Sequence, residues 1–222
     1  CWTNGGTGTV EQFSLFPPSP PPPAPPPSPP APPALPPTHK PTPTGSFTMA
    51  TQPMTFFNFA SGMCYDATED ALVIAMQGSN KALMLVSPTT GAAIKSVSHG
   101  LSYQAGVACA QQPHEYYVSD YTGNGYGPDL YRVSTSGDKS AASSEVDAYG
   151  GYPLTMYGDD TLVRGNPSTS SSFSMVKQLR FAPTSDLDAI AQTVTTDVAA
   201  GIGDMCYDGS HIFTLAYNPT TT

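Results

Sequence analysis

The sequence predicts an all-β repeat domain that follows an extended, proline-rich rod. Two observations carry this prediction. Seventeen of the 25 prolines lie between Pro17 and Pro43, whereas the chain from Ser46 onward has a globular composition with aromatic, β-branched and small residues. In this second part, short apolar runs recur with a period in the mid-forties and are separated by Gly, Asp and Asn turns, which is typical of repeated β-sheets.

The first element is the proline run at residues 17–37. Proline fixes φ, lacks an N–H donor and keeps the preceding residue out of the α region, so this run can form neither helix nor sheet. Its 21 residues predict a polyproline II rod, which at about 3.1 Å per residue spans roughly 65 Å. We expect residues 17–45 to be this rod, and residues 1–16 to end a preceding segment or form an edge strand.

The second part of the chain contains a repeated pattern. Each unit begins with Gly and Cys followed by an apolar run, and a second apolar run ends in a turn rich in Ser, Thr and Gly. Val86 and Val133 are 47 residues apart, and Val133 and Phe181 are 48 apart. The cysteine pattern is skipped once, at residues 151–157. The matching stretches are 62–66, 106–109 and 203–208, then 71–75, 116–118 and 212–216, then 83–91, 130–137 and 179–186.

A period in the mid-forties built from short strands indicates β-propeller blades. Residues 82–91 resemble the strand and Thr-Gly turn of β-propeller repeats, and the resemblance extends over about residues 55–222. It implies a β-propeller-like domain at residues 46–222. A closed propeller needs about four to eight blades, whereas this sequence shows three blades and part of a fourth. Either other segments complete the ring or the chain is a fragment of a longer protein. We favour the fragment, and open stacking of blades without closure is a further alternative.

Four candidate disulfide cysteines, Cys1, Cys64, Cys109 and Cys206, permit three pairings. The last three occupy equivalent repeat positions. Equivalent atoms in neighbouring blades usually lie farther apart than the roughly 7 Å between Cα atoms that a disulfide allows. We therefore expect these three to be buried small side chains. Cys1 is then unpaired or bonded upstream, and a bridge from Cys1 to the repeat domain is the alternative.

Some polar residues recur at equivalent repeat positions and are candidate sites. Asp66 and Asp208 could form a metal ring around a channel, but a repeated Asp more often caps a turn through its own side chain, and we expect that role. His114 and His211 both follow a cysteine by five residues, which predicts surface turn positions. The oxygen-rich stretch 120–129 resembles a calcium loop without its closing Glu, so a plain turn is favoured.

No catalytic residue, metal site or cofactor is expected. The four histidines lack zinc-ligand spacing, and no nucleophile elbow or phosphate-binding loop is present. The net charge is −9 and no basic cluster occurs, which disfavours a nucleic-acid partner. No apolar stretch is long enough to predict a membrane span. Only 11% of residues are charged, which suits a secreted protein hydrated by hydroxyls and attached sugars.

The proline run resembles the rods of green-algal hydroxyproline-rich glycoproteins, namely extensin-like cell-wall proteins and flagellar mastigoneme proteins. The resemblance rests on Ser-Pro-Pro-Pro-Pro and Ala-Pro-Pro-Pro-Ser-Pro-Pro and covers residues 17–43. It implies hydroxylation of prolines and O-linked arabinose or galactose. Asn166 and Asn218 are each followed by proline, so neither forms an N-glycosylation sequon, and any glycan is expected to be O-linked. The implied glycosylation sites are Pro17, Pro18, Ser19, Pro20, Pro21, Pro22, Pro23, Pro25, Pro26, Pro27, Ser28, Pro29, Pro30, Pro32, Pro33, Pro36 and Pro37.

These observations predict a secreted structural glycoprotein that assembles with copies of itself or with related glycoproteins into an extracellular filament or wall layer. It is not expected to be an enzyme. The alternative is a carbohydrate-binding propeller on a proline-rich spacer, because tyrosines can stack on sugar faces; a duller explanation is that Tyr simply suits strands. A third hypothesis is an extracellular hydrolase whose active site lies in blades that this sequence does not contain. The tyrosines concerned are Tyr116, Tyr117, Tyr121, Tyr126, Tyr131, Tyr149, Tyr152 and Tyr157.

Overall fold

The computed structural model describes eight stretches of the chain, and every regular element in them is a β-strand. The residues 17–45 of the expected rod lie outside these stretches. Wherever sheets form in the described part, neighbouring strands are antiparallel. The prediction of an all-β fold is therefore confirmed. The described stretches are 10–13, 59–77, 81–101, 103–120, 130–143, 153–167, 176–195 and 201–217.

Four sheets account for the described strands. The first contains β2 (Phe59–Asp66), β3 (Ala71–Gln77), β4 (Ala82–Val86) and β5 (Ala93–Ser98). The second contains β6 (Gln104–Gln111), β7 (His114–Asp120), β8 (Leu130–Ser134) and β9 (Lys139–Ala141). The third contains β10 (Leu154–Tyr157), β11 (Thr161–Pro167), β12 (Val176–Pro183) and β13 (Gln192–Thr195). The fourth contains β14 (Gly201–Tyr207), β15 (Ile212–Tyr217) and β1 (Val10–Phe13).

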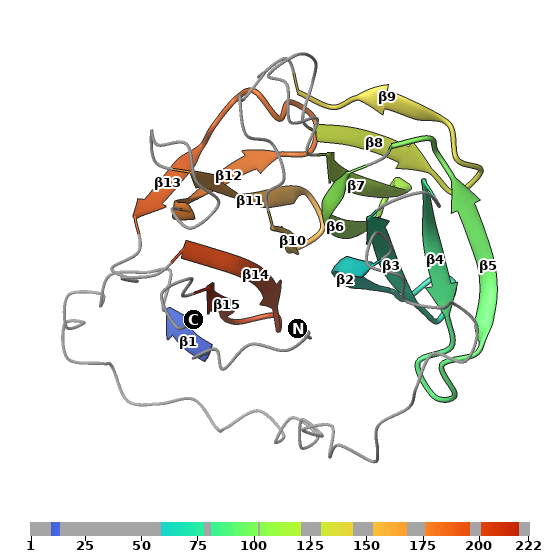
Figure 1. The fold of residues 1–222 in the computed structure, drawn as a ribbon. Helices are drawn as coiled ribbons and strands as arrows, with labels where there is room; N and C mark the ends of the chain where they lie inside the picture. The colour runs from blue at the N-terminus through green and yellow to red at the C-terminus, as the bar shows by residue number, and fades with distance from the viewer. Residues whose placement is uncertain are drawn as a thin grey trace, which may run out of the picture.

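The sheets follow one another around a common centre in chain order, which is a β-propeller-like arrangement (Figure 1). The first strand of each sheet lies innermost and contacts the first strand of the next sheet, from β2 to β6, β10 and β14. The outer strands β5, β9 and β13 lie at the periphery. The predicted turns at residues 87–91 and 134–138 join β4 to β5 and β8 to β9, and each is closed by a backbone hydrogen bond. The prediction of hairpin turns between the outer strands is therefore confirmed.

The apolar runs form the core because both faces of the inner strands are covered. All five residues of β4 are buried, and so are the last five of β7. Three apolar clusters lie at the seams between successive sheets, because alternate side chains of a strand point to opposite faces. A fourth cluster, around Met76 and Met84, lies on the other face of the first sheet and draws its members from that sheet.

The fourth sheet combines the two ends of the described chain. β15 pairs with β14 on one side and with β1 on the other, and Val10 lies opposite Leu215. The chain thus leaves the fourth sheet at Phe13 and enters the first sheet at Phe59. The proline-rich stretch therefore belongs to a connection that starts and ends in the same β-structure.

Candidate functional site

The seam between the first two sheets contains a disulfide bond between Cys64 and Cys109. Their Cα atoms are 5.7 Å apart, so the expectation that these equivalent positions are too distant to bond was wrong. The reason is the close approach of Gly62 on β2 to Gly106 on β6, which precede the two cysteines by two and three residues. A Cβ atom added to Gly62 would lie 2.9 Å from the Gly106 Cα, so this glycine lets β2 and β6 approach unusually closely.

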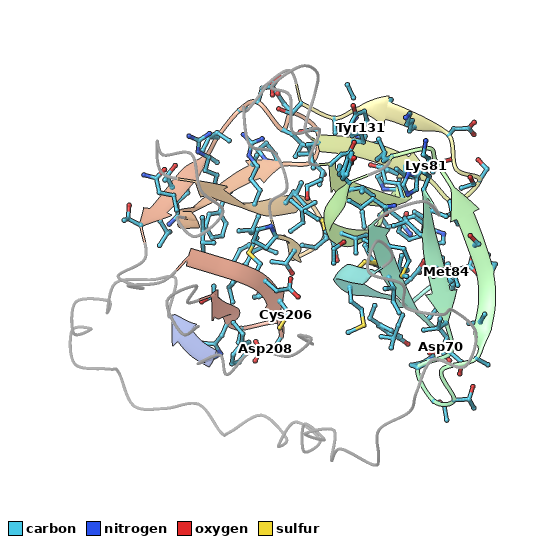
Figure 2. The ribbon with its side chains drawn as sticks, in the orientation of Figure 1. Asp70, Lys81, Met84, Tyr131, Cys206 and Asp208 are labelled. Carbon is cyan, nitrogen blue, oxygen red and sulfur yellow. A yellow bond between two sulfur atoms is a disulfide. The ribbon has the colours of Figure 1, made fainter. Side chains whose placement is uncertain are left out.

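The third equivalent cysteine is bonded as well. Cys206 on β14 is disulfide-bonded, so none of the three described cysteines is the free buried side chain that we expected. Cys1 lies outside the described residues. Figure 2 shows Cys206 close to Asp208 in the fourth sheet.

Beside the first disulfide, the Asp66 carboxylate is fully buried and accepts four hydrogen bonds. Its Oδ1 accepts the backbone N–H groups of Thr68 at 2.9 Å and Glu69 at 3.1 Å. Its Oδ2 accepts the Tyr116 hydroxyl at 2.8 Å and His114 Nε2 at 2.7 Å. The imidazole Nε2 must donate here because an ionised carboxylate has no proton to give. Asp66 thereby joins the β2–β3 turn of one sheet to strand β7 of the next.

The environment of Asp66 favours its ionised form. Burial acts to raise the pKa of the carboxyl group, but hydrogen bonds from His114, Tyr116 and the Glu69 amide outweigh it and hold the pKa below 3.8. Burial and the adjacent Asp66 carboxylate raise the pKa of Tyr116 far above its ordinary value, so the phenol stays a donor. A carboxylate has about four lone-pair sites, and all are used, so this cluster is suited to cross-linking rather than to proton transfer.

The prediction that Asp66 and Asp208 cap turns is confirmed. Asp208 Oδ1 accepts the backbone N–H groups of Ser210 at 2.8 Å and His211 at 2.7 Å, which repeats the local geometry of Asp66. Within the described stretches no group of three His, Cys, Asp or Glu side chains could hold a metal ion. His211 lies beside this turn, with Nδ1 3.9 Å from Asp208 Oδ2.

His114 departs from the surface turn position that we expected. Its side chain is only 24% exposed, and it contacts the buried carboxylate of the neighbouring sheet. The sequence carries a signal that was missed. His114 and Tyr116 fall at alternate positions of the strand after Cys109, so both side chains point to the face that meets the first sheet.

A second polar group lies deeper in the same seam. The Gln104 side chain is fully buried, and its Nε2 donates to the Met76 carbonyl at 2.9 Å. Ser61 Oγ donates to the Gln104 carbonyl at 2.6 Å, which ties β2 to β6. His99 Nδ1 accepts the Leu101 amide at 3.1 Å, and burial lowers the pKa of this imidazole to about 4. The seam is therefore held by specific polar contacts as well as by apolar packing.

Four of the eight tyrosines considered for sugar binding lie among the described residues. Tyr116 and Tyr117 are fully buried, so the duller explanation, that they suit strands, is confirmed for them. Tyr131 is half-buried beneath the Lys139 ammonium group, and Tyr157 packs on Phe181. Tyr121, Tyr126, Tyr149 and Tyr152 lie outside the described residues. Among the residues whose side chains the structure describes, the exposed aromatic ones are instead Tyr65 and Tyr103, each about half exposed.

Two further candidate regions fall partly or wholly outside the described residues. Asp120, the first residue of the oxygen-rich stretch, is buried, and its Oδ1 accepts the Tyr103 amide at 2.8 Å. Residues 121–129 lie outside, as do all glycosylation candidates between Pro17 and Pro37. No helix long and apolar enough to cross a membrane occurs among the residues that the structure describes.

Comparisons with known proteins place the chain near propeller-type structures only at low similarity. No family model matches, and no curated protein matches either. Hydrazine synthase of Kuenenia stuttgartiensis is 15% identical with a TM-score of 0.48, covering 69% of this chain and 42% of that chain. The WD40 repeats of RRP9 are 8% identical with a TM-score of 0.45, covering 66% and 41% respectively. The chain thus spans about two fifths of the length of these structures.

Proposed function

We propose that this protein is an extracellular structural glycoprotein, a subunit of a filament or wall layer in which a glycosylated proline rod is the stiff element and the β-domain mediates assembly. Mastigoneme-type filaments and algal wall layers are the contexts that the sequence resemblance suggests. The protein acts as a building element and carries no catalytic centre or cofactor in this proposal. Its partners are copies of itself or related glycoproteins.

The observation that carries the proposal is the state of the described cysteines. Cys64, Cys109 and Cys206 are all disulfide-bonded. Disulfides form and persist in oxidising surroundings such as the cell surface, and they are rare in the cytosol. A long proline run in such a compartment is accessible to hydroxylation and O-glycosylation. The bonded cysteines therefore support the same location that the proline run suggests.

The Asp66 cluster supports a mechanical role for the β-domain. A disulfide and a four-fold hydrogen-bonded carboxylate join the same two sheets. Such contacts hold neighbouring sheets in one fixed relation, which is what a filament subunit under tension requires. In contrast, the carbohydrate-binding alternative cannot draw on Tyr116 and Tyr117, because both are buried.

Glycopeptide mass spectrometry of the native protein tests the proposal. We expect peptides covering residues 17–37 to carry hydroxyproline and pentose or hexose additions on several prolines, with further hexose on Ser19 or Ser28. Unmodified proline throughout this run in the native protein would remove the wall or filament assignment. A glycan array with Tyr65→Ala and Tyr103→Ala variants tests the alternative, since both of these aromatic side chains are about half exposed.

A further inference from the structure

We propose that residues 99–101 form an acid-sensitive connection, in which protonation of His99 frees Leu101 from the seam between the first and second sheets. These three residues, here named the connecting segment, follow β5 and lead toward β6. The His99 imidazole is buried, and its hydrogen bond to the backbone fits only the neutral ring. Such a response to pH lies beyond the structural role proposed above and does not depend on it.

The connecting segment is held by backbone hydrogen bonds and by the apolar core. The N–H groups of His99 and Gly100 both donate to the carbonyl of Lys81, which precedes β4, at 3.0 Å. The Leu101 side chain is 3% exposed and belongs to the apolar cluster between the first and second sheets. Release of this segment therefore opens the seam at Leu101. The disulfide described above keeps the two sheets joined, so we expect the opening to be local.

The hydrogen bonds of His99 define its protonation state. Its side chain is buried, and Nδ1 accepts the Leu101 backbone N–H at 3.1 Å. Because that N–H group can only donate, Nδ1 carries no proton and the neutral ring has its proton on Nε2. No described residue forms a hydrogen bond with Nε2. A proton added to Nδ1 would face the Leu101 N–H, donor against donor, and would break the bond that holds the segment closed.

The charged groups around the segment also disfavour a second proton. A Cβ atom added to Gly100 would lie 3.8 Å from Lys139 Nζ on β9, and the positive charge of Lys139 opposes a positive charge on His99. The Lys81 side chain is exposed, where water and salt screen its charge. Burial raises the pKa of Asp120, at the end of β7, so protonation of Asp120 in acid favours the closed form and acts against His99.

The direction of the pH effect follows from the two states of His99. Burial lowers the pKa of the closed-state imidazole to about 4, although the neighbouring Gln104 side chain acts in the opposite direction, whereas a released histidine titrates near 6.5. Above pH 6.5 both states are neutral and the segment stays closed. As the pH falls below 6.5, the open state gains a proton that the closed state takes up only near pH 4, so acid favours opening. Between pH 7 and pH 5 the opening equilibrium should rise roughly twenty-fold.

Amide hydrogen exchange measured by NMR on the full chain at pH 7 and pH 5 tests this. Rates are divided by the intrinsic exchange rate at each pH to give protection factors. We expect the protection factor of the Leu101 amide to fall roughly twenty-fold between the two pH values. At both pH values it should be lower than that of the Val118 amide in β7, because local opening costs less than unfolding the sheet. Equal protection of the two amides would overturn local release.

Two variants isolate the contribution of His99. His99→Asn removes the titration but keeps an acceptor, since an Asn side chain can accept the N–H two residues on. Its Leu101 protection factor should change by less than about two-fold between pH 7 and pH 5. His211→Asn, in the turn between β14 and β15, is the matched control and should keep the roughly twenty-fold response. An equal fall in His99→Asn and in the unaltered chain, or no fall in the unaltered chain, would overturn the acid-sensitive connection.

A direct titration of the His99 ring protons by NMR does not depend on any variant folding. We expect a midpoint near 4 in the folded chain and near 6.5 in urea. A folded-state midpoint near 6.5 would show that the ring takes up a proton without leaving its place, and would overturn the proposal.

Discussion

The motif Cys-Tyr-Asp occurs twice, at 64–66 in the first sheet and at 206–208 in the fourth, and the two copies have different neighbours. Both aspartates cap the following turn through Oδ1. Asp66 is fully buried and also binds two side chains of the next sheet, whereas the Asp208 side chain is 47% exposed. The same local sequence therefore forms a cross-link in one place and a simple turn in the other.

The seams beside these motifs differ in the same way. A disulfide and buried hydrogen bonds join the first sheet to the second, as described above. Between the third and fourth sheets, the described residues form an apolar cluster around Met205, and the ring centroids of Tyr157 and Tyr207 lie 4.8 Å apart. Directional contacts fix one arrangement, while apolar packing tolerates adjustment. The seam that carries the disulfide lies at the start of the β-domain.

The largest expected effect comes from removing the first disulfide. A Cys64→Ser/Cys109→Ser variant should lose about 2–4 kcal/mol of unfolding free energy, because the bond closes a loop between residues 45 apart. Guanidinium denaturation, with the slope fitted separately for each variant, measures this loss. A loss below about 1 kcal/mol would mean that the polar contacts alone hold the seam.

Asp66 and Asp208, the aspartates of the two motifs, allow the most direct comparison of the first and fourth sheets. Asp66→Asn should cost about 2–3 kcal/mol, because the amide nitrogen would face two donors, the Tyr116 hydroxyl and the His114 Nε2–H. Asp208→Asn keeps its acceptor oxygen in an exposed turn and should cost less than about 0.5 kcal/mol. Equal losses in thermal unfolding would show that both residues act only as turn caps.

For Tyr65 and Tyr207, the tyrosines of the two motifs, the order of stability losses should be reversed, with the larger loss in the fourth sheet. Tyr207→Ala removes a ring that packs on Tyr157 between the third and fourth sheets, so we expect a loss of about 1–2 kcal/mol. Tyr65 is half exposed and donates its hydroxyl to the exposed Asp70, so Tyr65→Ala should cost less than about 0.5 kcal/mol. Urea denaturation of both variants decides the order, and a larger loss for Tyr65→Ala would reverse this assignment.

The smallest effect is a difference in pH dependence between the two ends of the β-domain. The folded-state pKa of Asp66 lies below its unfolded value of 3.8, so its stabilising contribution is complete above that pH and is lost as the pH falls through the folded pKa. Burial raises the pKa of Asp204 to about 6, so its carboxyl favours the folded state below pH 3.8 and this advantage is lost as the pH rises to about 6.

Asp204→Asn should therefore raise stability at pH 8 by about 1 kcal/mol and leave it nearly unchanged at pH 3. Thermal unfolding from pH 3 to 8 measures both slopes. If the variant is no more stable than the unaltered chain at pH 8, the Asp204 carboxylate is already well solvated.

Much of the fold could be predicted from the sequence because it depends on local pattern. The apolar runs, the turns at residues 87–91 and 134–138, and the capping role of Asp66 and Asp208 all follow from short stretches of sequence. The place of residues 151–157 as the skipped repeat position also agrees with β10 as the inner strand of the third sheet.

The cross-sheet contacts could not be predicted in this way because they depend on how closely the inner strands approach. The Cys64–Cys109 bond needs the close contact at Gly62 and Gly106, which repeat spacing alone does not reveal. The contact of His114 with Asp66 joins residues 48 positions apart. Likewise, the pairing of β1 with β15 depends on a strand of four residues that carries little periodic signal.

A side-chain-resolution map of the native assembled particle tests the account most directly. We predict density extending beyond the proline rings at residues 17–37. Bare proline rings throughout this run would contradict the glycosylated rod.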